Sequence, residues 1–292
     1  MMAAPPRVSV VIPVFNDPLR LGLCLDALER QSLPAAQLQV IVVDNGSEPE
    51  LSLQDRAFQL ILLRCPEPGS YAARNRALPH CDAGVVAFTD ADCRPRQDWL
   101  ASGLAALERQ GVDLLAGAVL LEPSSAVQPT AADLVEQTFA FRQELYVSRG
   151  GYGATANLFV RRALLTRLGG FDQRRKSGAD RDFGERARRA GSRIGYASEA
   201  AVFHPARDRR ELLHKARRVM GGRLDGVGAR PLLRLRELML HLRPLLREIW
   251  VAMRLSVPLR RRLAVLILLV QCRWEAVLEW LRLCLPHRTS LR

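Results

Sequence analysis

The sequence lacks several features that would place it in a simple class. No stretch reaches the about 18 to 20 uninterrupted apolar residues that a membrane-spanning helix needs, and the longest, Leu263 to Val270, is too short. Met1 to Arg7 lacks a basic segment followed by an apolar one, so we expect no cleaved signal. Internal repeats and low-complexity linkers are also missing. These absences favour a chain that folds without crossing a membrane.

Cysteine is scarce, and its spacing indicates neither a metal site nor a disulfide framework. We expect the six cysteines to be reduced thiols and the protein to be cytoplasmic.

The segment after the first apolar run, Pro13 to Pro18, contains no glycine. Dinucleotide-dependent dehydrogenases and nucleotidyltransferases of related fold hold phosphates with a glycine-rich loop at that place. The missing loop therefore argues against both classes.

The positive charge is concentrated at one end of the chain. The formal net charge is +13, and residues 207–292 carry all of that excess, with 20 Arg and Lys against 7 Asp and Glu. Residues 1–206 are balanced in charge. We therefore predict a neutral catalytic domain over residues 1–206 and a basic helical tail over residues 207–292, whose partner is anionic.

The tail combines leucine and arginine at helical spacing. Seven apolar residues are expected on one face of a helix: Leu232, Leu235, Leu238, Leu242, Leu245, Leu246 and Ile249. Arginines occupy other faces, and Trp250, Trp274 and Trp280 stand among the apolar positions. Such a helix suits an anionic membrane surface, and packing on the catalytic domain is the alternative. We expect no nucleic acid partner, because no recognisable nucleic-acid-binding motif is present.

Short apolar runs alternate with helical patterns along residues 1–206. The runs that predict strands are 8–13, 40–43, 60–63, 85–88 and 114–119. Helical spacing occurs at 19–31, 99–110, 131–147, 157–168 and 182–190. Apolar strands separated by helices predict an α/β fold, with a mostly parallel central sheet and helices on both faces.

Two acidic residues follow the strand predicted at 85–88. Asp90 and Asp92 would project from the carboxyl edge of the sheet, where open α/β folds bind their ligands. Carboxylates suit Mg²⁺ or Mn²⁺ bound together with substrate phosphates. Taken alone, the pair fits equally well a solvated turn before a helix capped by Asp98.

Five segments between residues 7 and 205 extend this picture. They are Val8 to Asn16, Val42 to Ser47, Ala73-Arg74-Asn75, Phe88 to Asp92 and Gly169 to Asp172. In this order they resemble the family 2 glycosyltransferases of GT-A fold. The resemblance implies an inverting enzyme that moves a sugar from a nucleoside-diphosphate sugar to a hydroxyl group, with Mg²⁺ or Mn²⁺ as cofactor. It also implies a glycan or lipid-linked acceptor in cell-envelope or exopolysaccharide synthesis.

The resemblance assigns a nucleotide pocket to several strand ends. Asp44 resembles the family's acceptor for the nucleobase, with Pro13 and Asn16 lining the same pocket. Arg74 resembles the arginine that closes the nucleotide site, and Asp90 the carboxylate that reaches the ribose. Simpler roles stay open for two of them, since Asp44 could cap the turn that follows it and Arg74 could form a surface ion pair.

The resemblance also implies a metal site and a catalytic base. Asp92 and His204 resemble the metal ligands, although a loop histidine packed on the tail is an alternative for His204. Asp180 resembles the base, with Asp182 as the runner-up or as a helix N-terminal acid. The glutamate that the family usually has before the base is replaced by Ala179.

Residues 150–157 lie where the family often contacts a sugar, which makes Asn157 a further binding candidate. The predicted function is therefore a metal-dependent glycosyltransferase bound to the inner face of the cell membrane through residues 207–292. A nucleotidyltransferase of related fold and an inactive nucleotide-binding relative are the alternatives.

Overall fold

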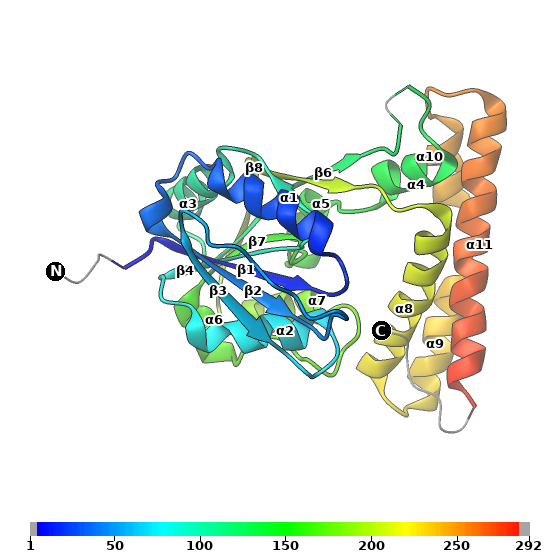
Figure 1. Cartoon of the computed structure of the whole chain (residues 1–292). Helices are drawn as coiled ribbons and strands as arrows, with labels where there is room; N and C mark the ends of the chain where they lie inside the picture. The colour runs from blue at the N-terminus through cyan, green and yellow to red at the C-terminus, as the bar shows by residue number, and fades with distance from the viewer. Residues whose placement is uncertain (1–4, 126, 286–292) are drawn as a thin grey trace. The chain divides into compact units, whose positions relative to one another are not determined.

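The computed structural model describes residues 5–125 and 127–285 (Figure 1), and these form two compact units. The first contains the described residues up to 120, together with 141–173 and 179–204. The second contains residues 121–140 and 174–178 and the described residues from 205 onward. It thus includes two segments that the sequence placed in the catalytic domain.

Within the described residues, the strands of the first unit belong to one eight-stranded sheet in the order β3-β2-β1-β4-β7-β6-β8-β5. The strands are β1 Val8–Val14, β2 Leu38–Asp44, β3 Gln59–Arg64, β4 Val85–Thr89, β5 Arg94–Pro95, β6 Leu114–Glu122, β7 Asn157–Arg161 and β8 Ile194–Pro205. The predicted α/β class is confirmed. The parallel arrangement holds for β3, β2, β1 and β4, whereas β7 runs antiparallel to both β4 and β6.

Helices cover both faces of this sheet, because successive side chains of β1 point to opposite faces and all of them are buried. Val10 and Ile12 pack in a cluster with α1 and α3, and Val11 packs in another with α2, α6 and α7. The helices of this unit are α1 Pro18–Glu29, α2 Ser70–Ala77, α3 Trp99–Gln110, α5 Gln143–Leu145, α6 Arg162–Leu168 and α7 Ala179–Arg189. Shorter turns are the 3₁₀ segments η1 Ala35–Gln37 and η2 Leu78–His80 and the π segment η3 Tyr146–Gly150.

Two helical predictions in this region are only partly correct, because helices form over part of each predicted segment. The first five residues of the segment 157–168 form β7, which pairs with β4 so that Asn157 lies opposite Thr89. This long-range pairing overrides the local helical spacing. The segment 131–147 is interrupted after Phe139, where Ala140 has an extended backbone with ψ of 162° and Phe141 a left-handed one with φ of 44°.

The second unit is helical in the described residues that follow 205, with α8 Arg209–Val227, α9 Pro231–Leu242, α10 Leu246–Met253 and α11 Leu259–Leu283, and it also contains α4 Ala131–Phe139. Residues of α4, α8, α10 and α11 share one buried apolar cluster. Inside the unit, the buried carboxylate of Glu136 accepts hydrogen bonds from Arg207 at 3.0 Å and Lys215 at 2.8 Å.

The tail helix predicted over Leu232 to Ile249 is divided in two. Helix α9 ends at Leu242 and α10 begins at Leu246, with Pro244 between them. Proline lacks the amide that would continue the helical hydrogen bonds, so the seven apolar residues cannot share one helical face. Among the helices of residues 5–125 and 127–285, none combines the length and apolarity needed to cross a membrane.

Candidate active site

The carboxyl ends of the parallel strands bring most of the predicted site residues to one edge of the sheet. Asp44 is the last residue of β2, and the strand register places it opposite both Val14 of β1 and Arg64 of β3. Asp90 follows β4 directly. Parallel strands in this order deliver their ends to a common ligand-binding edge, as the sequence indicated.

Asp44 has a buried carboxylate that is only partly satisfied. Its Oδ1 accepts a hydrogen bond from the amide of Ser47 at 2.8 Å, and the residue is 2% exposed. Its Oδ2 is buried and has no hydrogen-bond partner among the described residues, with Arg64 Nη1 3.9 Å away. Burial raises the pKa of Asp44, but hydrogen bonds from Ser47 and Leu51 and the charge of Arg64 together lower it below its ordinary value. A charged oxygen is therefore available to a donor such as a base N–H.

Asn16 connects the loops that follow β1 and β2. Its backbone amide donates to Ser47 Oγ at 2.9 Å, and its side-chain oxygen accepts from the amide of Glu48 at 2.9 Å. The positive φ of Asn16, 51°, is a conformation that asparagine tolerates better than most residues. Asn16 is exposed beside the Asp44 turn, as a pocket-lining residue should be.

Pro13, predicted to line the nucleotide pocket, lies inside β1 and not in the loop that follows the strand. It is buried in register with Val43, and the strand continues to Val14. Val11 is the last residue of β1 in register with β4, so the missing amide of Pro13 falls beyond that ladder. The residue shapes the strand that leads into the site.

Arg74 and Asp90 form a half-buried ion pair. Arg74 projects from α2, is 2% exposed and donates from Nη2 to Asp90 Oδ1. Its Nε is buried without a hydrogen-bond partner among the described residues. A guanidinium with a spare buried donor suits an additional anion such as a phosphate oxygen. The alternative of a surface ion pair does not fit this burial.

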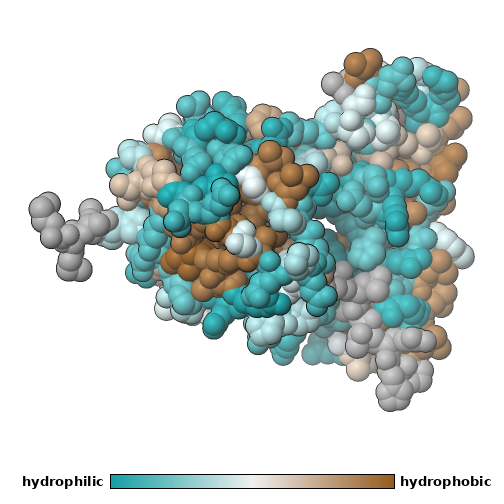
Figure 2. All heavy atoms as spheres, viewed as in Figure 1, coloured by the Kyte–Doolittle hydropathy of each residue, from teal (hydrophilic) through white to brown (hydrophobic). Residues whose placement is uncertain are grey.

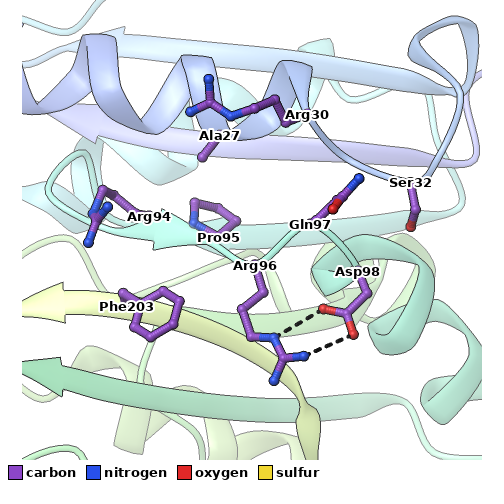
Figure 3. A pocket seen from close by; sticks show the side chains of 9 residues that line it. All are labelled: Ala27, Arg30, Ser32, Arg94, Pro95, Arg96, Gln97, Asp98 and Phe203. Carbon is purple, nitrogen blue, oxygen red and sulfur yellow. Dashed lines mark hydrogen bonds and ion pairs between the residues drawn. The ribbon is translucent and has the colours of Figure 1, made fainter.

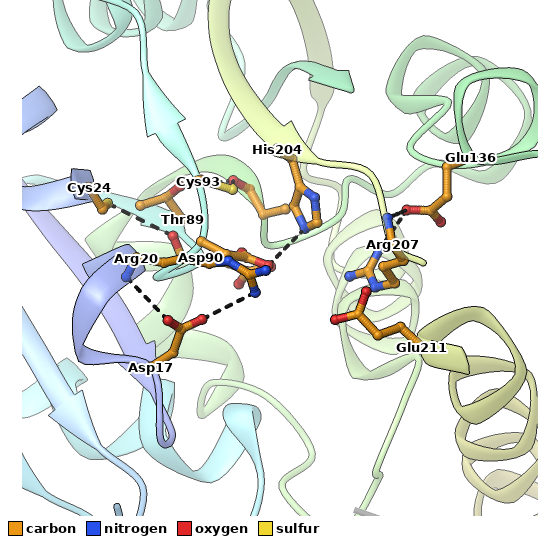
Figure 4. A network of polar contacts seen from close by, with 12 residues as sticks. Asp17, Arg20, Cys24, Thr89, Asp90, Cys93, Glu136, His204, Arg207 and Glu211 are labelled. Atoms are coloured by element: carbon orange, nitrogen blue, oxygen red, sulfur yellow. Dashed lines mark hydrogen bonds and ion pairs between the residues drawn. The ribbon is translucent and has the colours of Figure 1, made fainter. Parts of the chain in front are cut away.

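Asp92, Cys93 and His204 offer donor atoms that all lie within 4.8 Å of one another. His204 Nε2 is 3.4 Å from Asp92 Oδ2, and the histidine is buried in the first unit with its ring 4.7 Å from that of Phe141. Figure 4 shows His204, near the end of β8, beside the segment that carries Asp90 and Cys93. The structure thus brings together the two predicted metal ligands.

The chemistry of this cluster fits a hard divalent cation. A carboxylate oxygen and an imidazole nitrogen are both suitable ligands for Mn²⁺, and the carboxylate alone suits Mg²⁺. Burial raises the pKa of the Cys93 thiol well above its usual value, and its sulfur lies 3.8 Å from the carbonyl oxygen of Ala156. A buried thiol is a softer donor than a carboxylate or an imidazole, so Asp92 and His204 are the better ligand candidates for a hard cation.

Asp180 lies in the first turn of α7 and is half-buried. Burial raises its pKa above the ordinary value of 3.8, while the charge of Arg74 and a hydrogen bond from Tyr71 oppose the shift. These interactions place Asp180 in the same electrostatic environment as the Arg74–Asp90 pair. A carboxylate with a raised pKa is a stronger base than an ordinary one, which suits proton removal from a hydroxyl group.

The neighbours of Asp180 have structural roles. Asp182 accepts a hydrogen bond from Arg186 at 2.8 Å, one turn along α7. Its carboxylate is thus engaged within the helix, which favours Asp180 over Asp182 as the base. Ala179, at the position of the usual glutamate, is fully buried in the apolar cluster with Phe171 and Phe183.

Asn157 is not brought into the site, contrary to the sequence prediction. Its side chain is buried, where Oδ1 accepts from Trp99 Nε1 at 2.8 Å and Nδ2 donates to the carbonyls of Ala118 and Ala200, each at 2.8 Å. A β-carbon on Gly117 would come within 2.4 Å of that amide nitrogen. With its oxygen and both N–H groups bonded, Asn157 holds neighbouring strands together and does not contact a sugar.

Asn75 holds two of the sequence motifs together. Its Nδ2 donates to the carbonyl of Phe171 at 2.7 Å, and its Oδ1 accepts from the amide of Phe171 at 2.9 Å. The motif containing Gly169 to Asp172 is therefore anchored to α2, beside Arg74.

One hollow of the first unit lies away from the predicted site residues. It has a volume of about 740 Å³ and is lined by residues that include Arg30, Arg94, Arg96 and Phe203, shown in Figure 3, and by none of the predicted site residues. Arg94 pairs with Phe203 in the β5–β8 register. Both Arg94 and Phe203 line the hollow, whereas His204, the next residue of β8, does not.

Three site residues were not singled out from the sequence. Arg64 lies at the end of β3 opposite Asp44, Tyr71 acts on Asp180 from α2, and Ser47 bonds both Asp44 and Asn16. Arg64 could have been found from its place at the end of a predicted strand. Tyr71 has no such signal, because only the fold brings α2 and α7 together.

Comparison with known proteins decides the family. The family model for glycosyl transferase family 2 matches residues 9–167. The chain is 35% identical to the glycosyltransferase AglE of Haloferax volcanii over 77% of its own length and 75% of that protein. The chain belongs to glycosyltransferase family 2. It is also 33% identical to the pre-mycofactocin glycosyltransferase of Mycobacterium tuberculosis, over 68% of this chain and 43% of that protein.

Solved structures confirm the fold of this family 2 glycosyltransferase. The mannosyltransferase PcManGT from Pyrobaculum calidifontis, in complex with GDP-Man and Mn²⁺, matches with a TM-score of 0.61 and 20% identity over 98% of this chain and 90% of its own. TarS of S. aureus, in complex with UDP-GlcNAc, matches with a TM-score of 0.55 and 18% identity over 97% and 93%. The chain has the GT-A architecture and is a glycosyltransferase.

Proposed function

We propose that this family 2 glycosyltransferase transfers a sugar from a nucleoside-diphosphate sugar to a hydroxyl group, with a divalent metal ion and inversion at the anomeric carbon. One observation carries the proposal. Asp44, Arg74, Asp90, Asp92 and His204 meet in one unit, and both Asp44 Oδ2 and Arg74 Nε are buried without a hydrogen-bond partner among the described residues. A nucleotide would satisfy both groups, one through a base N–H and the other through an anionic oxygen.

The nucleotide end of the donor would occupy the strand ends. Asp44 accepts from the base, Asn16 and Ser47 hold the turn that positions Asp44, and Asp90 is directed by Arg74 towards the ribose. Donor complexes of similar structures contain either GDP-Man or UDP-GlcNAc. The base and the sugar of the donor therefore stay open for this chain.

Asp92 and His204 would hold Mg²⁺ or Mn²⁺ against the diphosphate. Such an ion neutralises the negative charge that develops on the leaving nucleoside diphosphate. The Mn²⁺ complex of PcManGT supports this proposal by similarity of fold. The buried imidazole gives the site a fixed ligand, because Phe141 packs against its ring.

Asp180 would act as the catalytic base. Its carboxylate takes the proton of the acceptor hydroxyl as that oxygen attacks the anomeric carbon, and the bond from this carbon to the diphosphate oxygen breaks. The electron pair of the broken bond leaves with the nucleoside diphosphate. A single displacement of this kind inverts the anomeric configuration. Asp180 itself forms no covalent bond.

The acceptor would be a glycan or a lipid-linked glycan of the cell envelope or of an exopolysaccharide. The basic charge of residues 207–292 supports this assignment, because it would attract the enzyme to the anionic inner, cytoplasmic face of a membrane. Relatives named for the biosynthesis of PGL/p-HBAD share 27% identity over 62% of this chain.

A panel of nucleoside-diphosphate sugars with Mg²⁺, Mn²⁺ or a chelator tests the proposal, scored by release of nucleoside diphosphate and by the anomeric configuration of the product. We expect metal-dependent release with at least one donor and an inverted product, and loss of turnover in Asp180→Asn with donor binding kept. Pyrophosphate release from a nucleoside triphosphate and a sugar phosphate would instead indicate a nucleotidyltransferase. Donor binding without turnover by the natural chain would indicate an inactive relative.

A further inference from the structure

Helix α11 carries an exposed apolar stripe along its full length. The members of the stripe are between 36% and 60% exposed: Leu259, Leu263, Ile267, Val270, Trp274, Leu278 and Leu281. The opposite side of the helix packs inside the second unit through Val265, Leu268 and Ala276. Soluble monomeric domains rarely leave so much contiguous apolar surface in water, so this face indicates a binding surface.

The spacing of the stripe indicates the shape of what covers it. Successive members are separated by four, four and three residues, and the pattern then repeats. An 11-residue repeat corresponds to about 3.67 residues per turn, close to the 3.6 of a straight helix. The stripe therefore runs nearly parallel to the helix axis, whereas the seven-residue repeat of a left-handed coiled coil would wind around it. A straight stripe suits a flat surface better than a supercoiled helix partner.

Helix α10 widens this apolar face. A groove of about 300 Å³ lies between the two helices, lined by Leu245, Ile249, Leu266, Ile267, Val270 and Gln271. Ile267 and Val270 belong to both the stripe and the groove. Trp250 of α10 is 57% exposed, and the guanidinium of Arg254 lies 3.8 Å from the centre of its ring. In Figure 2, brown side chains recur where Figure 1 draws α11.

The acidic residues of α10 and α11 are paired with arginines, and Glu248 of α10 lies 3.7 Å from Arg273. Both acidic residues of α11 are engaged inside the unit, since Glu275 pairs with Arg217 of α8 and the buried Glu279 pairs with Arg282. Arg247 and Arg260 are exposed beside apolar members of the face. Together with the +13 of residues 207–292, this arrangement complements a surface of negative charge.

We propose that the α10–α11 face, defined as the stripe together with the groove, docks on the interface of an anionic lipid bilayer, with α11 lying along the membrane plane. Apolar side chains enter the headgroup boundary, tryptophans lie at its level, and arginines meet the phosphates. The groove takes part of one lipid chain. Docking would hold the active site near a lipid-linked acceptor, and only this role of the face rests on the proposed function.

Flotation of the full chain with vesicles tests the docking face directly and requires no catalysis. Vesicles of phosphatidylcholine with about a third phosphatidylglycerol are compared with phosphatidylcholine alone. The test variant is Ile267→Glu/Trp274→Glu, which places two charges on the stripe. The control is Leu19→Glu, because Leu19 is 77% exposed and belongs to the first unit. Both variants change exposed side chains, so circular dichroism melting should show the natural fold.

We expect the natural chain and Leu19→Glu to float with the anionic vesicles, and the double variant to partition at least about tenfold more weakly. Equal flotation of all three chains would overturn the assignment of the face. The assignment would also be overturned if the natural chain did not bind vesicles but formed a dimer, while the double variant was a monomer. The face would then bind a second copy of the chain. Donor turnover measured on the same samples reports separately on the proposed function, so its failure and that of docking are distinguishable.

Discussion

The guanidinium of Arg74 donates a hydrogen bond to the carboxylate of Asp90 and so ties α2 to the segment after β4. The pair directs one oxygen of Asp90 and leaves the buried Nε of Arg74 for a further acceptor. Lysine has no planar fork and cannot serve both groups. We therefore expect Arg74→Lys to raise the KM for the donor by roughly tenfold or more.

The matched control for this prediction is Arg76→Lys on the same helix, because Arg76 is exposed. Its donor KM should stay within about twofold of the natural value, since exposed ion pairs contribute little. Steady-state kinetics with the preferred donor measure both values. An unchanged KM in Arg74→Lys would remove Arg74 from the donor site.

The contact between Asn75 and Phe171 depends on the glycine that precedes Phe171. Gly170 has a φ of 73°, and a β-carbon there would meet Asn75 Oδ1 at 2.5 Å. Gly170→Ala should therefore reduce the free energy of unfolding by about 2 to 4 kcal/mol, from backbone strain and from the clash together. Urea unfolding followed by circular dichroism measures the loss.

Gly169→Ala separates the two contributions. Gly169 has a similar φ of 71°, but its added β-carbon would meet no atom within 4 Å. We expect it to cost only the backbone term of about 1 to 2 kcal/mol. Equal losses in the two variants would show that the approach of Gly170 to Asn75 is unimportant for stability.

The raised pKa of Asp180 predicts the acidic limb of the pH–rate profile. A base acts in its charged form, and burial disfavours that form, so activity should fall as the pH decreases through a pKa above the ordinary 3.8. The hydrogen bond from Tyr71 lowers this pKa. Tyr71→Phe removes that hydrogen bond and should move the acidic limb to higher pH, by less than about one unit.

The measurement is kcat against pH for the natural chain, Tyr71→Phe and the control Tyr196→Phe. Tyr196 is affected by Glu144 and Glu199 and not by Asp180, so its variant should keep the natural limb. A shift of the limb to lower pH in Tyr71→Phe would contradict the role of Tyr71 in positioning the base. A merely structural tyrosine would change stability without moving the limb.

The sequence predicted the parts of the site that follow buried parallel strands. Asp44 and Asp90 were located because each follows an apolar run, and the order of such strands places their ends at one edge. Asn157 was misplaced because its local spacing is helical, whereas pairing with β4 buries its side chain among three strands. Contacts between distant segments, such as Tyr71 with Asp180, have no local signal at all.

The same contrast holds for the tail. Its amphipathic character and charge were visible as composition, but the exposed face was assigned to residues 232–249, where Pro244 divides the helix. The structure instead shows the longest exposed apolar stripe on α11. Packing against α8 determines which side of α11 is buried, and this tertiary contact cannot be read from the local spacing of apolar residues.

The metal cluster yields the last prediction. The loss of either proposed ligand, Asp92 or His204, should weaken Mn²⁺ binding in the presence of a nucleoside diphosphate by at least roughly tenfold. The effect is large because the protein supplies few ligands to the site. Electron paramagnetic resonance of free Mn²⁺ measures the affinity of Asp92→Asn and His204→Gln without relying on turnover. Asp98→Asn is the control, because Asp98 is an exposed carboxylate that pairs with Arg96.

Cys93→Ala decides whether the third member of the cluster is a ligand. A thiol is a soft donor that suits Mn²⁺ poorly, so we expect natural Mn²⁺ affinity and a loss of about 1 kcal/mol in unfolding free energy from the small cavity. Loss of Mn²⁺ affinity in Cys93→Ala, with affinity kept in His204→Gln, would reverse the ligand assignment. A thiolate ligand would also shift the preference towards Zn²⁺, so competition between Mn²⁺ and Zn²⁺ on the same variants separates a hard site from a soft one.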